Sequence, residues 1–263
     1  MGALRLLMIG DVAGKPGMRA VSRLLPRIVA ERSIDLVVAN GENAAGGLGL
    51  TPELARELLG MGVDVVTNGN HVWRQSEFKN YIGQEPRLLR PLNLPETQPG
   101  RGFGVFETPG GVKVGVVNLI GRVYMEPSDS PFTAADRALA ALKGVKVVLV
   151  DFHAEATSEK RAMAYYLDGR VSAVIGTHTH VQTADEQIME KGAAFLTDVG
   201  MTGPHDSVIG MRRDIIVDRF VTGMPHAFKL AKGGTRFQAA ALEIDPSTGR
   251  AASIERIDIP LPD

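Results

Sequence analysis

Short apolar runs alternate with amphipathic stretches along most of this chain. Residues 4–9 predict a buried strand, residues 16–31 a helix with Pro16 at its first position, and residues 36–39 the next strand. Buried strands separated by helices are typical of parallel βαβ units. The same alternation predicts further strands at 63–67, 112–119, 146–150 and 171–175, and further helices at 51–60, 132–142 and 157–167.

The last third of the chain has a different character, because strand-like segments follow one another with little helix between them. One helix is predicted there, at 214–222. A region so rich in strands favours a second sheet packed on the first, so we expect an α/β fold with two packed β-sheets flanked by helices. The strand-like segments lie at 187–189, 193–196, 236–244 and 253–259.

The segment 83–111 is rich in proline and glycine and interrupts the alternation. It predicts loops and a short hairpin, in the position of a small cap or loop insertion. We find no internal repeat, low-complexity tail or long linker in the sequence. A chain of 263 residues with 44% hydrophobic residues can form a large core, and we predict a single catalytic domain spanning 1–263.

Charge and composition exclude several classes of protein. A formal net charge of -1 and a pI near 6.6 give no global attraction to nucleic acid, so we expect no stable nucleic-acid complex. No stretch approaches the ~20 apolar residues of a membrane span, and the first residues lack the features of a signal peptide, so we expect no membrane association and no processing. Because the chain has no cysteine, it suits the reducing cytoplasm and offers imidazole, carboxylate and amide groups to a metal.

Carboxylates and amides follow the first three predicted strands. Asp11 comes after the first, Glu42 and Asn43 after the second, and Asn70 and His71 after the third. Because the carboxyl ends of parallel strands lie along one rim of a sheet, we expect these side chains to converge. Each residue alone also has a structural explanation, since Asp and Asn often bond to their own backbone in turns.

Three histidines follow later strands and are aimed at the same rim. His153 comes after the strand at 146–150, while His178 and His180 lie two residues apart in a segment that we expect to be extended, so that both point the same way. Burying so many polar groups without compensation costs several kcal/mol, and cations would compensate them together. The set therefore favours a two-metal hydrolytic centre. His205 is a weaker candidate for the wall of the same cleft.

The order of these motifs resembles the calcineurin-like metallophosphoesterase superfamily, in a bacterial subgroup of di-metal 2',3'-cyclic nucleotide phosphodiesterases. The motifs are Gly-Asp, Gly-Glu-Asn, Gly-Asn-His, a lone His and Gly-Thr-His-Thr-His. The subgroup resemblance lies in residues 41–47 and 197–203, in Ala13 where most members of the superfamily have histidine, and in Glu42 where most have aspartate. It implies a four-layer α/β/β/α fold.

The resemblance also implies a binuclear centre of two divalent or mixed-valence metal ions, iron first and manganese second. A hydroxide that bridges the metals would attack a small phosphodiester in line, and His71, which would not ligate, would be the catalytic acid for the leaving ribose oxygen. By resemblance, one metal would be held by Asp11, Glu42, Asn43 and His180, and the other by Glu42, Asn70, His153 and His178.

Three classes of function stay open at this point. A metal-dependent phosphodiesterase acting on 2',3'-cyclic nucleotides is the main hypothesis. A phosphomonoesterase or nuclease with the same di-metal centre is the second, although a nuclease needs a basic track that the sequence does not show. A regulatory metal-binding module with little turnover is the third. The irregular loops at 83–111 and 121–131 could also supply a subunit contact, so we expect a homo-oligomer.

Overall fold

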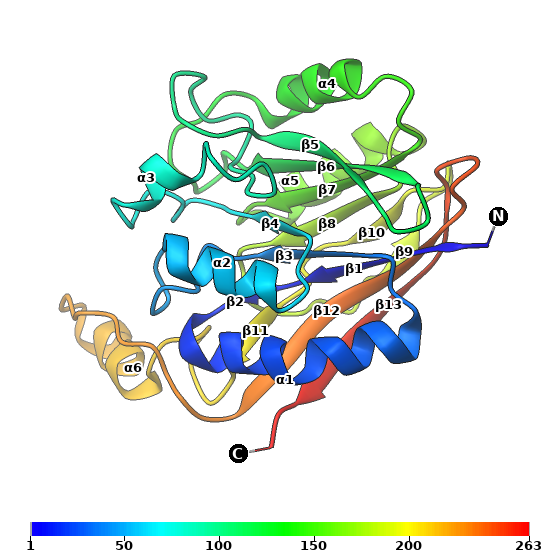
Figure 1. Cartoon of the computed structure of the whole chain (residues 1–263). Helices are drawn as coiled ribbons and strands as arrows, with labels where there is room; N and C mark the ends of the chain where they lie inside the picture. Colours follow the sequence, from blue (N-terminus) through cyan, green and yellow to red (C-terminus); the bar gives the residue numbers. More distant parts are fainter. Residues whose placement is uncertain (1, 263) are drawn as a thin grey trace.

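The computed structural model describes residues 2–262, in which two β-sheets pack face to face (Figure 1). The first sheet contains β1 (Leu4–Ile9), β2 (Asp11–Val12), β3 (Leu36–Asn40), β4 (Val65–Thr67), β11 (Met201–Pro204), β12 (Thr235–Ile244) and β13 (Ala251–Pro260). Its order is β2-β11-β12-β1-β3-β4, with β13 paired to β12. The second sheet has the order β5-β6-β7-β8-β10-β9, from β5 (Phe103–Glu107), β6 (Lys113–Ile120), β7 (Val147–His153), β8 (Ala173–Thr177), β9 (Gln187–Ile188) and β10 (Ala194–Leu196).

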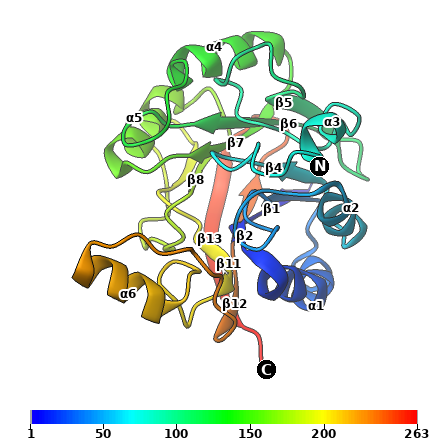
Figure 2. The same ribbon diagram turned by 90° about the vertical axis from the view of Figure 1, so that its left-hand side faces the viewer.

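Helices cover the outer face of each sheet (Figure 2). The helices α1 (Gly14–Arg32) and α2 (Pro52–Gly60) pack on the first sheet, and α4 (Pro131–Ala141) and α5 (Thr157–Leu167) on the second. Strand β1 shows why its run is apolar throughout: Leu7 and Ile9 face the helices, whereas Leu6 and Met8 face the other sheet. The predicted four-layer α/β/β/α fold is confirmed.

Parallel pairing brings the carboxyl ends of several strands together. Strands β1, β3 and β4 are parallel neighbours in the first sheet, and β6, β7, β8 and β10 in the second. The register places Asn40 opposite Thr67 in one sheet and His153 opposite Thr177 in the other. Functional groups that follow these strands therefore meet at one rim, as the alternating pattern predicts.

The structure corrects some predicted elements. Helix α1 begins at Gly14, which has a positive φ of 55°, so Pro16 is its third residue and not its first. Strand β7 continues to His153 and β8 to Thr177, two or three residues beyond the predicted ends. The short strands β2 and β11, which pair in parallel, were not predicted, because β2 has two residues and includes the buried polar Asp11, so no apolar run marks it.

The segment 83–111 joins the edge strands of the two sheets. After the short helix α3 (Phe78–Tyr81), Leu88 forms a bridge with Val66 of β4, and β5 then pairs with β6 in the expected hairpin. The buried guanidinium of Arg90 donates to the carbonyls of Pro91 and Pro99 and so fixes the loop between them. The cap role and the single-domain organisation stay predictions. No helix within residues 2–262 is long and apolar enough to cross a membrane.

Candidate metal centre

Glu42 lies at the middle of the polar cluster, directly after β3. Its backbone N–H donates to Asn40 Oδ1 at 3.1 Å, and its side chain is 1% exposed. Glu42 Oε1 lies 3.2 Å from His153 Nε2, 3.3 Å from Asn43 Nδ2 and 3.4 Å from His71 Nδ1. Its other oxygen accepts from the His71 backbone N–H at 2.8 Å. One carboxylate therefore contacts three side chains from three separate segments.

Asp11, Asn43 and His180 form one group beside Glu42. Asp11 Oδ1 lies 3.5 Å from Asn43 Nδ2 and 3.7 Å from His180 Nε2, and the two nitrogens are 3.1 Å apart. Asp11 is fully buried in β2, which pairs with β11, and its second oxygen accepts from the His178 backbone N–H at 3.1 Å. This group brings a carboxylate, an amide and an imidazole together.

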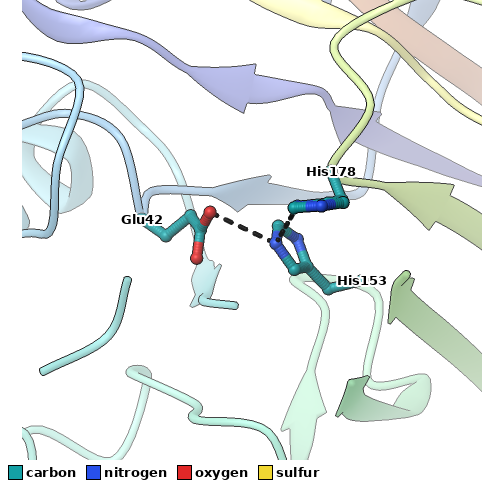
Figure 3. Close-up of side chains that lie close together, drawn as sticks. All are labelled: Glu42, His153 and His178. Carbon is teal, nitrogen blue, oxygen red and sulfur yellow. Dashed lines mark hydrogen bonds and ion pairs between the residues drawn. The ribbon is translucent and has the colours of Figure 1, made fainter. Parts of the chain in front are cut away.

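His153, His178 and Asn70 form a second group on the other side of Glu42. His153 Nε2 lies 2.9 Å from Asn70 Oδ1 and 3.0 Å from His178 Nδ1. Figure 3 shows Glu42 and His178 both directed at the same ring nitrogen of His153, and the three residues each offer a ligand atom within 4.8 Å of the others. All seven predicted metal ligands thus lie in one connected cluster.

The segment 178–180 reaches this cluster by an unexpected conformation. The prediction of an extended segment is wrong, since His178 has φ 100° and His180 has φ 62°. Asp198 holds Thr179 between them, accepting from its backbone N–H at 3.0 Å and its hydroxyl at 2.8 Å. Buried Lys160 lies 2.7 Å from the same carboxylate. The two imidazoles therefore reach the two different groups because the backbone turns between them.

A buried network behind His153 was missed in the sequence. His153 Nδ1 lies 2.9 Å from Thr177 Oγ1, which donates to Asp151 at 2.7 Å, and Thr67 Oγ1 donates to the second Asp151 oxygen at 2.5 Å. This network turns Nε2 of His153 towards Glu42, as partners of metal-ligating histidines commonly do. Burial raises the pKa of Asp151 to about 6. The available signal was the position of Asp151, two residues before His153 in the same strand.

The electrostatics of the cluster keep its carboxylates ionised. Burial would raise the pKa of Asp11, but the hydrogen bond and charge of His180 outweigh it and hold the pKa well below its usual range. Burial likewise opposes ionisation of Glu42, yet His153 brings its pKa down to about 2. Burial and the charge of His153 lower the pKa of His178 to about 3, which leaves it neutral at pH 7. Two buried negative charges among imidazole and amide groups are a donor set that fits divalent cations.

His71 lies at the edge of the cluster. Its Nδ1 is 2.8 Å from Asn43 Oδ1, its side chain is 22% exposed, and burial lowers its pKa. It lines a cleft of about 470 Å³ together with Glu42, Asn43, His178 and His180. His205 does not line this cleft; its Nε2 lies 2.9 Å from the carbonyl oxygen of Met201.

Comparison with known proteins finds similarity along nearly the whole chain. The family model described as YmdB-like protein matches residues 7–257. The chain is 46% identical over 255 residues to the 2',3'-cyclic-nucleotide 2'-phosphodiesterase of Bacillus subtilis (strain 168), an alignment that covers 97% of this chain and 96% of that protein.

Two solved structures have the same fold along their length. A hypothetical protein from Thermus thermophilus matches with a TM-score of 0.92 and 46% identity, covering 98% of this chain and 100% of that one. A protein described as a novel phosphatase, from Mycoplasma pneumoniae, matches with a TM-score of 0.93 and 34% identity. The match covers 99% of this chain and 94% of that one. The architecture is therefore shared with these two proteins along nearly the whole of their chains.

Proposed function

Because this chain belongs to the YmdB-like protein family, with a calcineurin-like metallophosphoesterase fold, we propose that it is a metal-dependent phosphodiesterase acting on small phosphodiesters, 2',3'-cyclic nucleotides first. The observation that carries the proposal is the contact of Glu42 with both His153 and Asn43, because it joins the two proposed groups of metal ligands. The name of the Bacillus subtilis relative supports the substrate class.

The donor set divides into two proposed ligand groups that share Glu42. When bound, the two cations would supply positive charge at the phosphoryl oxygens and lower the pKa of a water molecule. Iron is the first proposed metal and manganese the second, since imidazole and carboxylate donors accept both. A cytoplasmic location and a homo-oligomer are also part of the proposal. The first group is Asp11, Asn43 and His180, and the second is Asn70, His153 and His178.

His71 is the proposed general acid. Its Nδ1 faces the oxygens of Asn43 and Glu42, so this nitrogen is the one that carries a proton in a donor contact. When the ring takes up a second proton, Nε2 is the atom that carries it and that would give it to the departing ribose oxygen. The bond from the His71 backbone N–H to Glu42 holds the residue beside the ligand cluster without making it a ligand.

The lining of the cleft favours a substrate with one phosphate over a nucleic acid. Among the described residues that line it, Arg219 is the one Lys or Arg side chain. A nuclease would need several cations along a track of successive phosphates. A phosphomonoesterase using the same centre is the remaining enzymatic alternative.

A substrate panel tests this proposal. Metal-replete protein is assayed with 2',3'-cyclic, 3',5'-cyclic, linear and aryl phosphodiesters, and with a nucleoside monophosphate. We expect the highest kcat/KM for the 2',3'-cyclic nucleotides. A preference for the monophosphate would support the phosphomonoesterase, whereas negligible turnover of every compound by protein with a full metal content would support a regulatory metal-binding module.

A further inference from the structure

The cleft beside the candidate metal centre continues into an apolar half that the proposed chemistry does not use. This half is built from the loop after β11, from helix α6 (Arg213–Thr222) and from the segment that follows it. Helix α6 projects beyond the packed layers at the lower left of Figure 1. We call this half the base pocket, defined by Ile209, Met211, Ile216, Phe220 and Phe228.

The base pocket is fixed to the metal centre by a direct contact. The carbonyl oxygen of Ile209 lies 2.9 Å from His180 Nδ1, on the side of the ring away from Asn43. The two ends of the α6 segment are also tied together, since the Arg212 N–H donates to Lys229 O and the Ala231 N–H to Gly210 O, both at 2.8 Å. The pocket is therefore held at a set position relative to the reacting groups.

The aromatic rings of the base pocket are largely exposed to solvent and are not part of the buried core. Phe220 is 82% exposed and Phe228 is 49% exposed, whereas Ile216 is the buried residue of α6. The Arg219 guanidinium carbon lies 4.8 Å from the centroid of the Phe228 ring, which braces that ring from one side. The open cleft thus presents an aromatic surface next to polar groups, at a volume typical of small-ligand sites.

We propose that the base pocket binds the nucleobase of the substrate while the phosphate lies against the metal centre and His71; this rests on the proposed function. An exposed aromatic ring in an apolar pocket suits a flat heterocycle, because stacking on it needs no hydrogen bond to the edge of the base. The pocket residues carry no side-chain amide or carboxylate that could read such an edge. Purines should therefore bind better than pyrimidines, through their larger stacking surface.

The test compares a substrate that has a base with one that lacks it. Phe228→Ala is assayed with adenosine 2',3'-cyclic phosphate and with glycerol 1,2-cyclic phosphate, and Val217→Ala is the matched control, since Val217 lies on α6, is exposed, and does not line the cleft. We expect Phe228→Ala to lose roughly tenfold in kcat/KM for the nucleotide, mainly through KM, as for one base stacked on an aromatic ring. The base-free substrate and the control should change little.

Equal losses of kcat/KM for both substrates, or no loss for either, would overturn the proposal that the base pocket binds the nucleobase. Adenosine binding, measured by titration calorimetry on protein of matched metal content, tests it without turnover. We expect wild-type and Val217→Ala protein to bind adenosine and Phe228→Ala to bind it roughly tenfold more weakly. If no cyclic phosphodiester is hydrolysed, the proposed function fails and the adenosine result still decides the pocket. Wild-type protein that does not bind adenosine would contradict it.

Discussion

Lys160 Nζ lies 2.7 Å from Asp198 Oδ2, and neither side chain is more than 1% exposed. The same carboxylate holds the backbone and hydroxyl of Thr179, between the histidines at 178 and 180. A charge pair in the interior therefore fixes the turn that sends two imidazoles into the candidate metal centre. In the sequence, Asp198 was noted only within the 197–203 motif and Lys160 was not singled out, because nothing in the pattern links position 160 to position 198.

Replacing the lysine tests the role of this pair. Lys160→Met removes the cation and leaves the Asp198 carboxylate buried without it, so we expect a loss of about 3–5 kcal/mol in the free energy of unfolding. Arg137→Met is the control, because Arg137 pairs with Glu96 on the surface, where such pairs contribute about 0–1 kcal/mol. Urea unfolding measures both. Equal losses in the two variants would show that the buried pair contributes no more to the free energy of unfolding than the surface pair does.

Gly69 is predicted to be required for the metal centre. A Cβ at this position would lie 2.2 Å from His153 Nε2 and 2.5 Å from Glu42 Oε2, so Gly69→Ala must displace one of them. We expect this variant to lose bound metal and activity together. Gly60→Ala is the control, because its Cβ would meet nothing within 4 Å. Elemental analysis that finds the same metal content in both variants would contradict the prediction.

His71→Ala separates catalysis from metal binding. The proposed role as acid predicts that the variant keeps its metal content and loses ~100- to 10,000-fold in kcat. A metal-replete variant with unchanged turnover would remove the role. Loss of metal along with activity would instead make His71 a ligand or a support for Glu42, to which its backbone N–H bonds.

The lowered pKa of Asp185 predicts that the stability of the fold depends on pH. Burial opposes its ionisation, but bonds from Thr197 and Thr183 outweigh this and lower its pKa in the folded protein. An acid whose folded pKa is depressed stabilises the fold above its unfolded pKa of ~3.9, and this stabilisation is lost as the pH falls through the folded pKa. Asp185→Asn should therefore be destabilised at pH 7, and its difference from wild type should shrink by pH 3. A constant difference in thermal unfolding across this range would contradict the prediction.

The sequence predicts the layers of the fold and the members of the cluster for one physical reason. Parallel strands must end at a common rim, and buried strands such as β1 have apolar side chains on both faces, so their positions can be read from the chain. The conformation of 178–180 could not be predicted, because it depends on Asp198 and Lys160, which approach only in the folded protein. The network of Asp151 and Thr177 was missed although Asp151 lies two residues before His153 in β7, because its bond to Thr177 runs between neighbouring strands.

The base pocket, too, was not predicted from the pattern of apolar and polar residues. Helix α6 was predicted close to its observed bounds, but its exposed aromatic residue Phe220 gives no sign in the sequence that it faces a cleft. The structure links the base pocket to the metal centre through Ile209, whose carbonyl oxygen contacts His180. Specificity elements of this kind lie on segments outside the core, where apolar periodicity carries little information.

Anomalous X-ray diffraction from crystals grown with manganese is the most direct test of whether two cations share Glu42. We expect two anomalous peaks, one among Asp11, Asn43 and His180 and one among Asn70, His153 and His178, both in contact with the Glu42 carboxylate. A single peak that leaves one group without metal, or none with the imidazoles turned apart, would contradict it.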